Sequence, residues 1–346
     1  MATVTKESKN KIRVDYEGKL TFKERLMSKL RTANTWIKVV INIFRFILML
    51  GVSYVILYPF FSRIAGSFMT REDVLDSTIS LIPKHFTLDI YKYIILENHY
   101  LDAIWNTLLI SLMCALVQTL IACVVGYGLA KFKFKGNGFV MVLVIITMVI
   151  PHKALEINMG QHLVNFDLFS LTTAGIPGLF ELIFGSPIDL INTPIPLLLL
   201  SLTGLAFKNG LYIYLLRQFF KGVPDELEES AYVDGSGVFR TFFQIILPLS
   251  IPMMITVFLF SFSWQWTDEF YTGMFWASNS TFYLMSDIYS LIPPSYDIYK
   301  NLAGASLYEN VIKNTSSMLI IAPIIILYIF CQKYLVQGIE RSGLVG

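Results

Sequence analysis

The sequence is poor in charged residues and in cysteine. Of its 346 residues only 15% are charged, against 55% that are apolar, whereas soluble domains average about 25% charged residues. This composition excludes an ordinary soluble domain and predicts an all-α integral membrane protein. The cysteines lie inside apolar stretches at Cys114, Cys123 and Cys331. They therefore predict neither a disulfide framework nor a metal cluster.

Motifs for catalysis and for nucleotide binding are also missing. Lys19 follows Gly18, but the earlier glycine of a phosphate-binding loop is absent, so we expect no ATP site in this chain. No nucleophile elbow of the form G-x-S-x-G occurs. None of the histidines has the spacing to a glutamate that a zinc peptidase requires: His85, His99, His152 and His162. The sequence predicts a protein that is not an enzyme and holds no cofactor of its own.

Long apolar stretches are abundant instead. A membrane span needs roughly 20 apolar residues, and six stretches satisfy this, at about 43–65, 104–130, 139–159, 197–220, 246–270 and 317–336. We therefore predict one membrane domain of six helices over residues 39–346. No cleavable signal peptide is expected, because the first thirty residues are polar.

Residues 1–38 form a basic tail, with Lys and Arg in clear excess over Asp and Glu. Such an excess marks the cytoplasmic side of a membrane protein. Thr21 and Glu24 have capping-box spacing, and an apolar stripe follows at Phe22, Leu26, Leu30, Ala33 and Ile37. The tail is therefore either an amphipathic helix on the inner leaflet or a solvated arm; the composition fits both.

The loops between the spans predict the orientation in the membrane. The 131–138 loop carries Lys131, Lys133 and Lys135, whereas the 160–196 loop has acidic residues and no Lys or Arg. The first is expected inside and the second outside. Both termini and residues 221–245 then lie in the cytoplasm, and loops 66–103 and 271–316 lie outside.

The most polar part of the chain after the tail is the acidic segment, residues 225–248. Asp225 and Glu228 have the spacing of a capping box, so a short helix is expected to begin there. Gly235 is expected to end it, and Ser236 to cap a second helix with an apolar stripe at Phe239, Phe242, Phe243 and Ile246. Pro248 is expected to close this pair of helices. Its charged face is either merely solvated or a docking surface, and we favour docking.

One motif in the acidic segment points to a family. Glu229-Ser230-Ala231, then Gly235 after three residues and Ile245-x-Leu247-Pro248 after nine more, resembles the EAA signature of ABC importer permeases, with Ser230 replacing an alanine. The resemblance implies the six-helix arrangement of type I importers and a coupling helix that docks on a separate ATPase. The coupling residues it implies are Glu228, Glu229, Ser230, Ala231, Asp234, Gly235, Phe239, Leu247 and Pro248.

Further segments resemble the carbohydrate-uptake branch of these permeases. They include residues 85–91, 105–108, 126–136, 149–151, 216–224 and 332–338. The resemblance implies a sugar importer of the bacterial cytoplasmic membrane. Its implied partners are a second, homologous permease, two ATPase subunits that bind ATP and Mg²⁺, and an extracytoplasmic sugar-binding protein. No nucleic-acid partner is implied. The 160–196 loop is longer than this family predicts. It is either a contact for the binding protein or tolerated surface, and we favour the latter.

Polar residues within the predicted spans are candidates for the substrate pathway, because charges at membrane depth are costly. Lys208 lies near the middle of the fourth span. Glu156 lies i, i+3 from Lys153, so it is either part of the pathway or only the charge partner of Lys153. Trp264 and Trp266 offer rings that stack on sugars, or belong to the interfacial aromatic belt. The full candidate set is Glu156, Lys208, Asn209, Tyr212, Trp264, Gln265, Trp266 and Asp268.

Two alternatives remain open at the level of sequence. The EAA signature is shared across substrates, so the chain could be an ABC permease for peptides or other small solutes. A stand-alone secondary transporter, with Lys208, Glu156 and Asp268 as a proton relay, is the alternative from another class. That alternative leaves the acidic segment unexplained.

Overall fold

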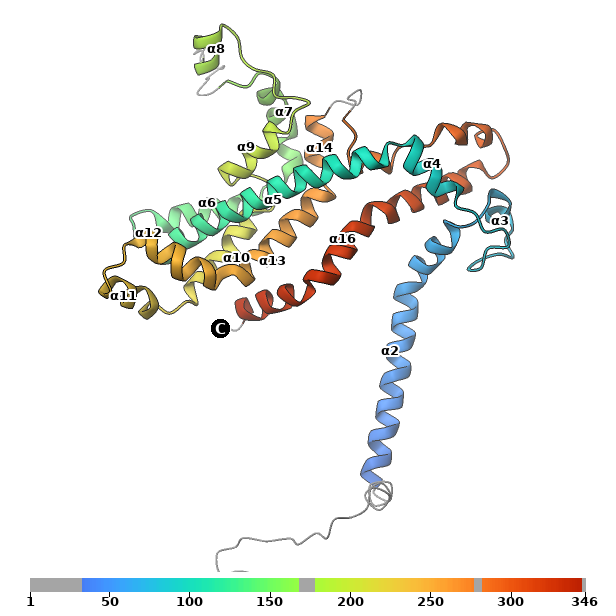
Figure 1. Ribbon diagram of the computed structural model, residues 1–346, viewed down its shortest axis with the longest axis horizontal. Helices are drawn as coiled ribbons and strands as arrows, with labels where there is room; N and C mark the ends of the chain where they lie inside the picture. Colours follow the sequence, from blue (N-terminus) through green and yellow to red (C-terminus); the bar gives the residue numbers. More distant parts are fainter. Residues whose placement is uncertain (1–32, 168–177, 277–281, 344–346) are drawn as a thin grey trace, which may run out of the picture. The chain divides into compact units, whose positions relative to one another are not determined.

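A computed structural model describes residues 33–167, 178–276 and 282–343 of the chain (Figure 1). Over these ranges the fold is helical, and β pairing is limited to two isolated bridges, Met69 with Phe86 and Phe166 with Ile188. The predicted all-α class is confirmed. The amphipathic helix predicted around Thr21 lies outside the described residues, and the division at residue 38 stays a prediction.

The first described helix, α2 (Ala33–Gly66), lies almost wholly in the first of two compact units, residues 1–63. Its apolar side chains are exposed around the whole circumference, as at Phe44, Met49 and Val55. A helix that is apolar on all sides is suited to lipid rather than to water. It contains the predicted span 43–65 but begins earlier, at Ala33.

The second unit, residues 64–346, is built around three long helices. These are α5 (Tyr100–Lys131), α13 (Leu247–Trp266) and α16 (Ala305–Gly343), and each is long and apolar enough to cross a membrane, like α2. A shorter helix, α10 (Asn209–Lys221), packs against α5 and α13 around the buried side chains of Tyr212, Leu216 and Val257. The close approach of α10 to α5 occurs at Gly126, where a Cβ would lie 3.0 Å from the Arg217 nitrogen.

The third and fourth predicted spans are each interrupted in the structure, so neither is one continuous helix, and their assignment as spans stays a prediction. Helix α6 (Asn137–Val149) ends before Pro151 and is followed by η1 (His152–Leu155) and α7 (Glu156–Val164) after a bend of 95°. The ring of Pro151 forces Ile150 into an extended conformation (ψ 124°), which stops α6.

The fourth span is divided into α9 (Ile195–Thr203) and α10 by a break at Gly204, which has φ +75°. Four described helices pass the length and hydropathy test for a span, or five if the bent pair counts as one. The exact count of six therefore stays a prediction.

Short helices form the connections at the two ends of the second unit. These are α3 (Arg71–Leu75), α4 (Asp89–Glu97), α8 (Leu179–Phe184), α14 (Phe270–Phe275), α15 (Met285–Ile288) and η4 (Pro294–Tyr299), together with α11 (Glu226–Val233) and α12 (Val238–Thr241) of the acidic segment.

Hydrogen bonds between loops group them as the topology prediction requires. Asn98 donates to the Leu291 carbonyl at 2.9 Å, and Asn192 N–H donates to the Phe275 carbonyl at 2.7 Å. These bonds join the three loops that were assigned to the outer side. Lys131, at the start of the loop assigned to the inner side, binds Asp225 of the acidic segment.

Candidate functional site

The acidic segment folds as two helices joined by a tight turn. Helix α11 (Glu226–Val233) ends at Gly235, which has φ +82° as the prediction required. Ser236 N–H donates to the Ala231 carbonyl at 2.9 Å and Gly235 N–H to the Tyr232 carbonyl at 3.0 Å. These two bonds form a Schellman motif, which satisfies the last carbonyls of α11 and fixes the direction of the following chain.

Three local predictions for this segment are wrong. Asp225 and Glu228 form no capping box, because both carboxylates bind side chains of α5 instead. Ser236 does not cap the second helix, α12 (Val238–Thr241), whose N-cap is Gly237. Pro248 does not close the pair either: α12 continues through a π turn, η3 (Phe242–Ile246), into α13, so that Val238–Trp266 is one helical run.

The π turn is explained by Pro248. Proline has no N–H for the usual bond four residues back, and its ring crowds the preceding turn. The Leu247 N–H instead reaches the Phe242 carbonyl, five residues back. The wider turn accommodates the proline without ending the helix.

Helix α11 is attached to the end of α5 by a buried polar cluster. The Tyr127 hydroxyl donates to Glu228 Oε1 at 2.9 Å, and Glu228 is 7% exposed. The Lys131 ammonium donates to the Val223 carbonyl at 2.6 Å and to Asp225 Oδ1 at 2.5 Å, and lies 3.9 Å from Glu228 Oε2. A buried carboxylate is stable only when hydrogen bonds and a nearby cation compensate its lost hydration. Glu228 has both.

The opposite side of the acidic segment is exposed. The predicted apolar stripe divides: Phe242 and Ile246 are buried against the bundle, whereas Phe239 is 80% and Phe243 60% exposed. Val233, at the end of α11, is 87% exposed. The other coupling residues inferred from the motif also vary in exposure: Glu229, Ser230, Asp234, Gly235 and Pro248 are exposed, Leu247 is half-buried and Ala231 is buried.

Lys208 lies in the break between α9 and α10 rather than inside a helix. It has a left-handed backbone, with φ 62°, and its ammonium lies 4.8 Å from the Phe207 ring and 5.1 Å from the Trp264 ring. A cavity of about 310 Å³ lies beside it. The break in the third span forms one wall and the start of α10 the other: Thr147, Met148, Val149, Ile150, Pro151, His152, Lys208, Gly210 and Leu211. Non-helical backbone at membrane depth is tolerated where it lines such a cavity.

A second, smaller cavity brings together three other predicted pathway residues. Its lining comes from α5, α13 and the adjoining loops: Gln118, Phe207, Ser261, Trp264, Gln265 and Asp268. Gln118 donates to Ser201 at 3.2 Å and accepts from Ser261 at 2.7 Å. This buried amide thereby connects α5, α9 and α13. Asp268 lies two residues before α14 begins and accepts from the Thr272 N–H in its first turn at 2.9 Å.

The remaining pathway candidates lie elsewhere. Asn209 and Tyr212 are fully buried, and their side-chain polar atoms have no hydrogen-bond partner. Glu156 is exposed on α7 and makes no ion pair with Lys153. Lys208 and Asp268 line different cavities and Glu156 lines neither, so the described cavities do not gather the three residues of the proposed proton relay.

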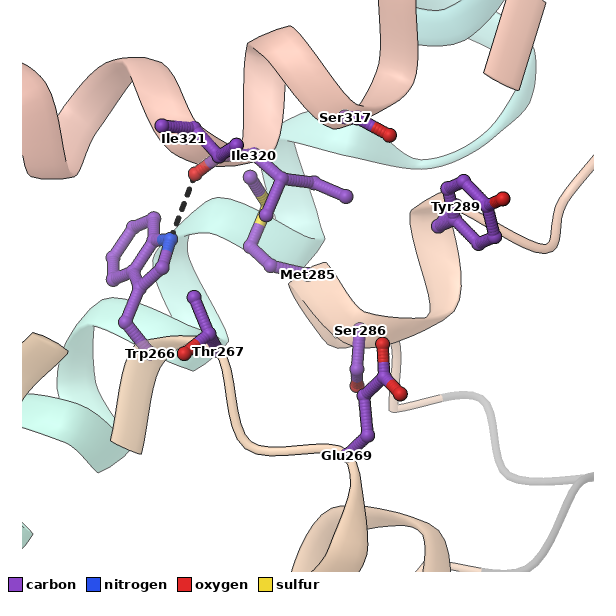
Figure 2. Close-up of a pocket in the computed structure, with 9 residues that line it drawn as sticks. All are labelled: Trp266, Thr267, Glu269, Met285, Ser286, Tyr289, Ser317, Ile320 and Ile321. Carbon is purple, nitrogen blue, oxygen red and sulfur yellow. Dashed lines mark hydrogen bonds between the residues drawn. The ribbon is translucent and has the colours of Figure 1, made fainter. Parts of the chain in front are cut away.

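Trp266 faces a different cavity, of about 280 Å³ (Figure 2). Its ring is buried against α16, and its Nε1 donates to the Ile320 carbonyl at 2.9 Å. Glu269, Ser286 and Tyr289 form the polar side of this cavity. Trp264 and Trp266, for which sugar stacking and the interfacial aromatic belt were both open, therefore line separate cavities, because positions i and i+2 of a helix point in different directions.

Sequence analysis missed the residues that hold α11. Tyr127 was noted only within a family-like segment and Lys131 only there and as a basic loop residue, although their i, i+4 spacing places both on one face of a helix. Gln118 was also missed. Its signal was the presence of an amide within an apolar stretch.

Comparison with known proteins agrees with this architecture. Residues 118–341 match the family described as binding-protein-dependent transport system inner membrane component. The match covers more than half of the chain, which therefore belongs to this family of ABC transporter permeases.

Two curated relatives and one solved structure are similar over most of their length. The arabinooligosaccharides transport system permease protein AraQ of Halalkalibacterium halodurans is 28% identical over 301 residues, 85% of this chain and 93% of the relative. The galactooligosaccharides transport system permease protein GanQ of Bacillus subtilis is 28% identical over 307 residues, which cover 88% of this chain and 95% of that relative. A crystal structure of a bacterial ABC transporter involved in alginate import has a TM-score of 0.65 at 18% identity, covering 88% of this chain and 98% of that one. At that identity it supports the fold alone.

Proposed function

We propose that this chain is one of two homologous permease subunits in a bacterial ABC carbohydrate importer. It forms half of the translocation pathway and couples to a separate ATPase through the acidic segment. The observation that carries the proposal is the geometry of α11: one side is pinned to α5 through buried Glu228, and the other presents Glu229 and apolar side chains to solvent.

The exposed side of the acidic segment has the composition of a docking surface. Val233, Phe239 and Phe243 are large apolar side chains more than half exposed on the tip of the unit. Interface centres are apolar and bordered by polar groups, here Glu229 and Asp234. The surface therefore suits a groove on a partner protein, and we assign that partner as the ATPase, which binds ATP and Mg²⁺.

A sugar substrate is supported by the relatives and by the polar groups at the helix breaks. Lys208 and Thr147 line the larger cavity, and Trp264 lies beside Lys208. An ammonium donates hydrogen bonds to sugar hydroxyls, and an aromatic ring stacks on a pyranose face. Since peptides have the same need for polar contacts, the oligosaccharide names of the relatives favour sugar over other small solutes.

The orientation follows from the basic loop around Lys131. We place this loop, the acidic segment and both termini in the cytoplasm. The binding protein then delivers sugar to the opposite face, formed by α3, α4, α14 and α15. ATP binding must favour the outward-facing over the inward-facing state, and a shift from 1:99 to 99:1 takes about 5.5 kcal/mol of differential binding. This free energy enters through the acidic segment.

The test is to purify the tagged chain gently from its native membrane and identify its partners by mass spectrometry. We expect an ATPase and a second permease to accompany the wild type, and the ATPase to be lost from Glu229→Lys. Glu181→Lys makes the same change at an exposed site in the 160–196 loop and should retain the ATPase. A chain that purifies alone and still transports sugar after reconstitution would refute the proposal.

A further inference from the structure

Tyr127 and Lys131 lie one turn apart on α5 and hold α11 at two points. Tyr127 binds Glu228 inside α11, at 2.9 Å, and Lys131 binds the entry to α11 through the Val223 carbonyl and Asp225. The Lys131 side chain is only 7% exposed. This is a two-point attachment between a long helix and a short one, in which Glu228 and Lys131 are buried and Asp225 is exposed.

The Tyr127 ring also contacts the elements on either side of α11. Its centroid lies 5.5 Å from that of Phe220, at the end of α10, and 4.7 Å from that of Phe242, in the π turn. One side chain of α5 therefore touches the element before α11, α11 itself and the element after it.

We propose that Tyr127, Glu228 and Lys131 are positioning residues that make α11 move as one body with α5. A displacement of α11 by the ATPase is then transmitted to α5 instead of being absorbed by the flanking turns. This inference rests on the proposed function, and it assigns Glu228 a role inside the permease, distinct from that of exposed Glu229.

An attachment of this kind is needed because α11 is short. A helix of 8 residues is unstable by itself, and the segments that join it to α10 and α12 are a Gly-Val-Pro-Asp stretch and a glycine turn. Without the buried cluster, a push on its exposed side would shift α11 alone.

Helix α5 can carry the displacement to the substrate pathway. It is continuous from Tyr100 to Lys131, and Gln118 lies nine residues before Tyr127, roughly 14 Å along the helix axis. Gln118 is hydrogen-bonded to Ser201 of α9 and Ser261 of α13. Motion of α5 therefore reaches the helix break beside Lys208 through direct contacts.

The first experiment uses Tyr127→Phe, which removes one hydroxyl and keeps the ring contacts. The complete complex is reconstituted in vesicles, and sugar uptake and ATP hydrolysis are measured in the same sample. We expect the ATPase to remain bound and hydrolysis to continue, while sugar transported per ATP falls about tenfold, as for loss of one hydrogen bond to a charged group. An unchanged ratio would overturn the proposal, and so would loss of the ATPase, which would make Tyr127 a docking residue.

The second experiment uses charge compensation, so that it does not depend on any one variant. Lys131→Met leaves the buried Glu228 carboxylate without its cation, and we expect transport per ATP to fall. Adding Glu228→Gln removes that charge but keeps an acceptor for the Tyr127 hydroxyl, so the double variant should recover part of the ratio, although the bonds of Lys131 to Val223 and Asp225 stay lost. Lys135→Met, at an exposed position in the same loop, is the matched control and should resemble the wild type.

A merely structural role predicts a different pattern. If the cluster only stabilised the fold, the variants would lower the melting temperature and the yield of assembled complex, but each assembled complex would keep its ratio. The proposal would also be refuted if the double variant transported no more sugar per ATP than Lys131→Met does. Wild-type vesicles that show no ATP-dependent uptake would refute the proposed function instead, so the two failures are distinguishable.

Discussion

The contact between α5 and α10 at Gly126 yields a sharp stability prediction. A Cβ at this position would lie 3.0 Å from the Arg217 nitrogen, 3.1 Å from Leu216 Cβ and 3.3 Å from the Ile213 carbonyl oxygen. Two of these three atoms belong to the backbone of α10, so a side-chain rotation cannot relieve the crowding. Gly126→Ala must separate the helices, and overpacking of this kind costs about 1–3 kcal/mol.

The matched control is Gly128→Ala, two residues along the same helix. No atom lies within 4 Å of a Cβ there, and alanine is the better helix former by roughly 1 kcal/mol. We therefore expect the two variants to shift the melting temperature in opposite directions, downwards for Gly126→Ala and slightly upwards for Gly128→Ala.

The free cysteines provide the assay. Cys114 and Cys123 are buried, and Cys331 is partly exposed, so in a Cys331→Ser background a thiol-reactive dye reports unfolding of the core. Since α5 also carries Tyr127, Gly126→Ala should reduce sugar transported per ATP as well. Equal melting temperatures for Gly126→Ala, Gly128→Ala and the parent would refute the close packing of α5 on α10.

Two further predictions concern charged groups. Lys208→Met should lower the rate of sugar uptake about tenfold, because a charged hydrogen-bond donor is lost, while the ATPase stays bound. The control is Lys153→Met, at an exposed position. Equal uptake by the two variants would show that Lys208 is not part of the substrate pathway. Lys131 holds the pKa of Asp225 below its ordinary value. Their pair therefore contributes stability above about pH 4 that is lost as the pH falls through the lowered pKa. Melting temperatures recorded from pH 3 to pH 8 should fall towards low pH, and this fall should be smaller in Asp225→Asn than in the wild type. An equal fall in the two proteins would refute this assignment.

The class of fold and the family were predictable from local sequence patterns. Apolar stretches of sufficient length specify membrane helices whatever surrounds them, and α5, α13 and α16 lie where these stretches predict. Gly235 ends α11 as predicted, because a positive φ is a requirement of the local backbone. The EAA motif is likewise contiguous, so it is readable without a structure.

The breaks in the third and fourth spans were harder to predict. Pro151 and Gly204 are visible in the sequence, but such residues are tolerated inside membrane helices when neighbours satisfy the backbone. Whether Pro151 bends a helix or stops it depends on the cavity that it faces. The same holds for Pro248, which a π turn absorbs.

The sequence by itself determined that this chain crosses a membrane, where its polar segment lies and which signature that segment carries. Only the tertiary structure decided how the polar groups are paired. The sequence pattern paired Asp225 with Glu228, three positions further along the chain, as a local capping box. In the structure each carboxylate instead binds α5, about a hundred residues away in sequence. Local spacing does not reveal such partners, because only the folded helices bring them within reach: a hydroxyl for buried Glu228, which must be compensated, and an ammonium for exposed Asp225.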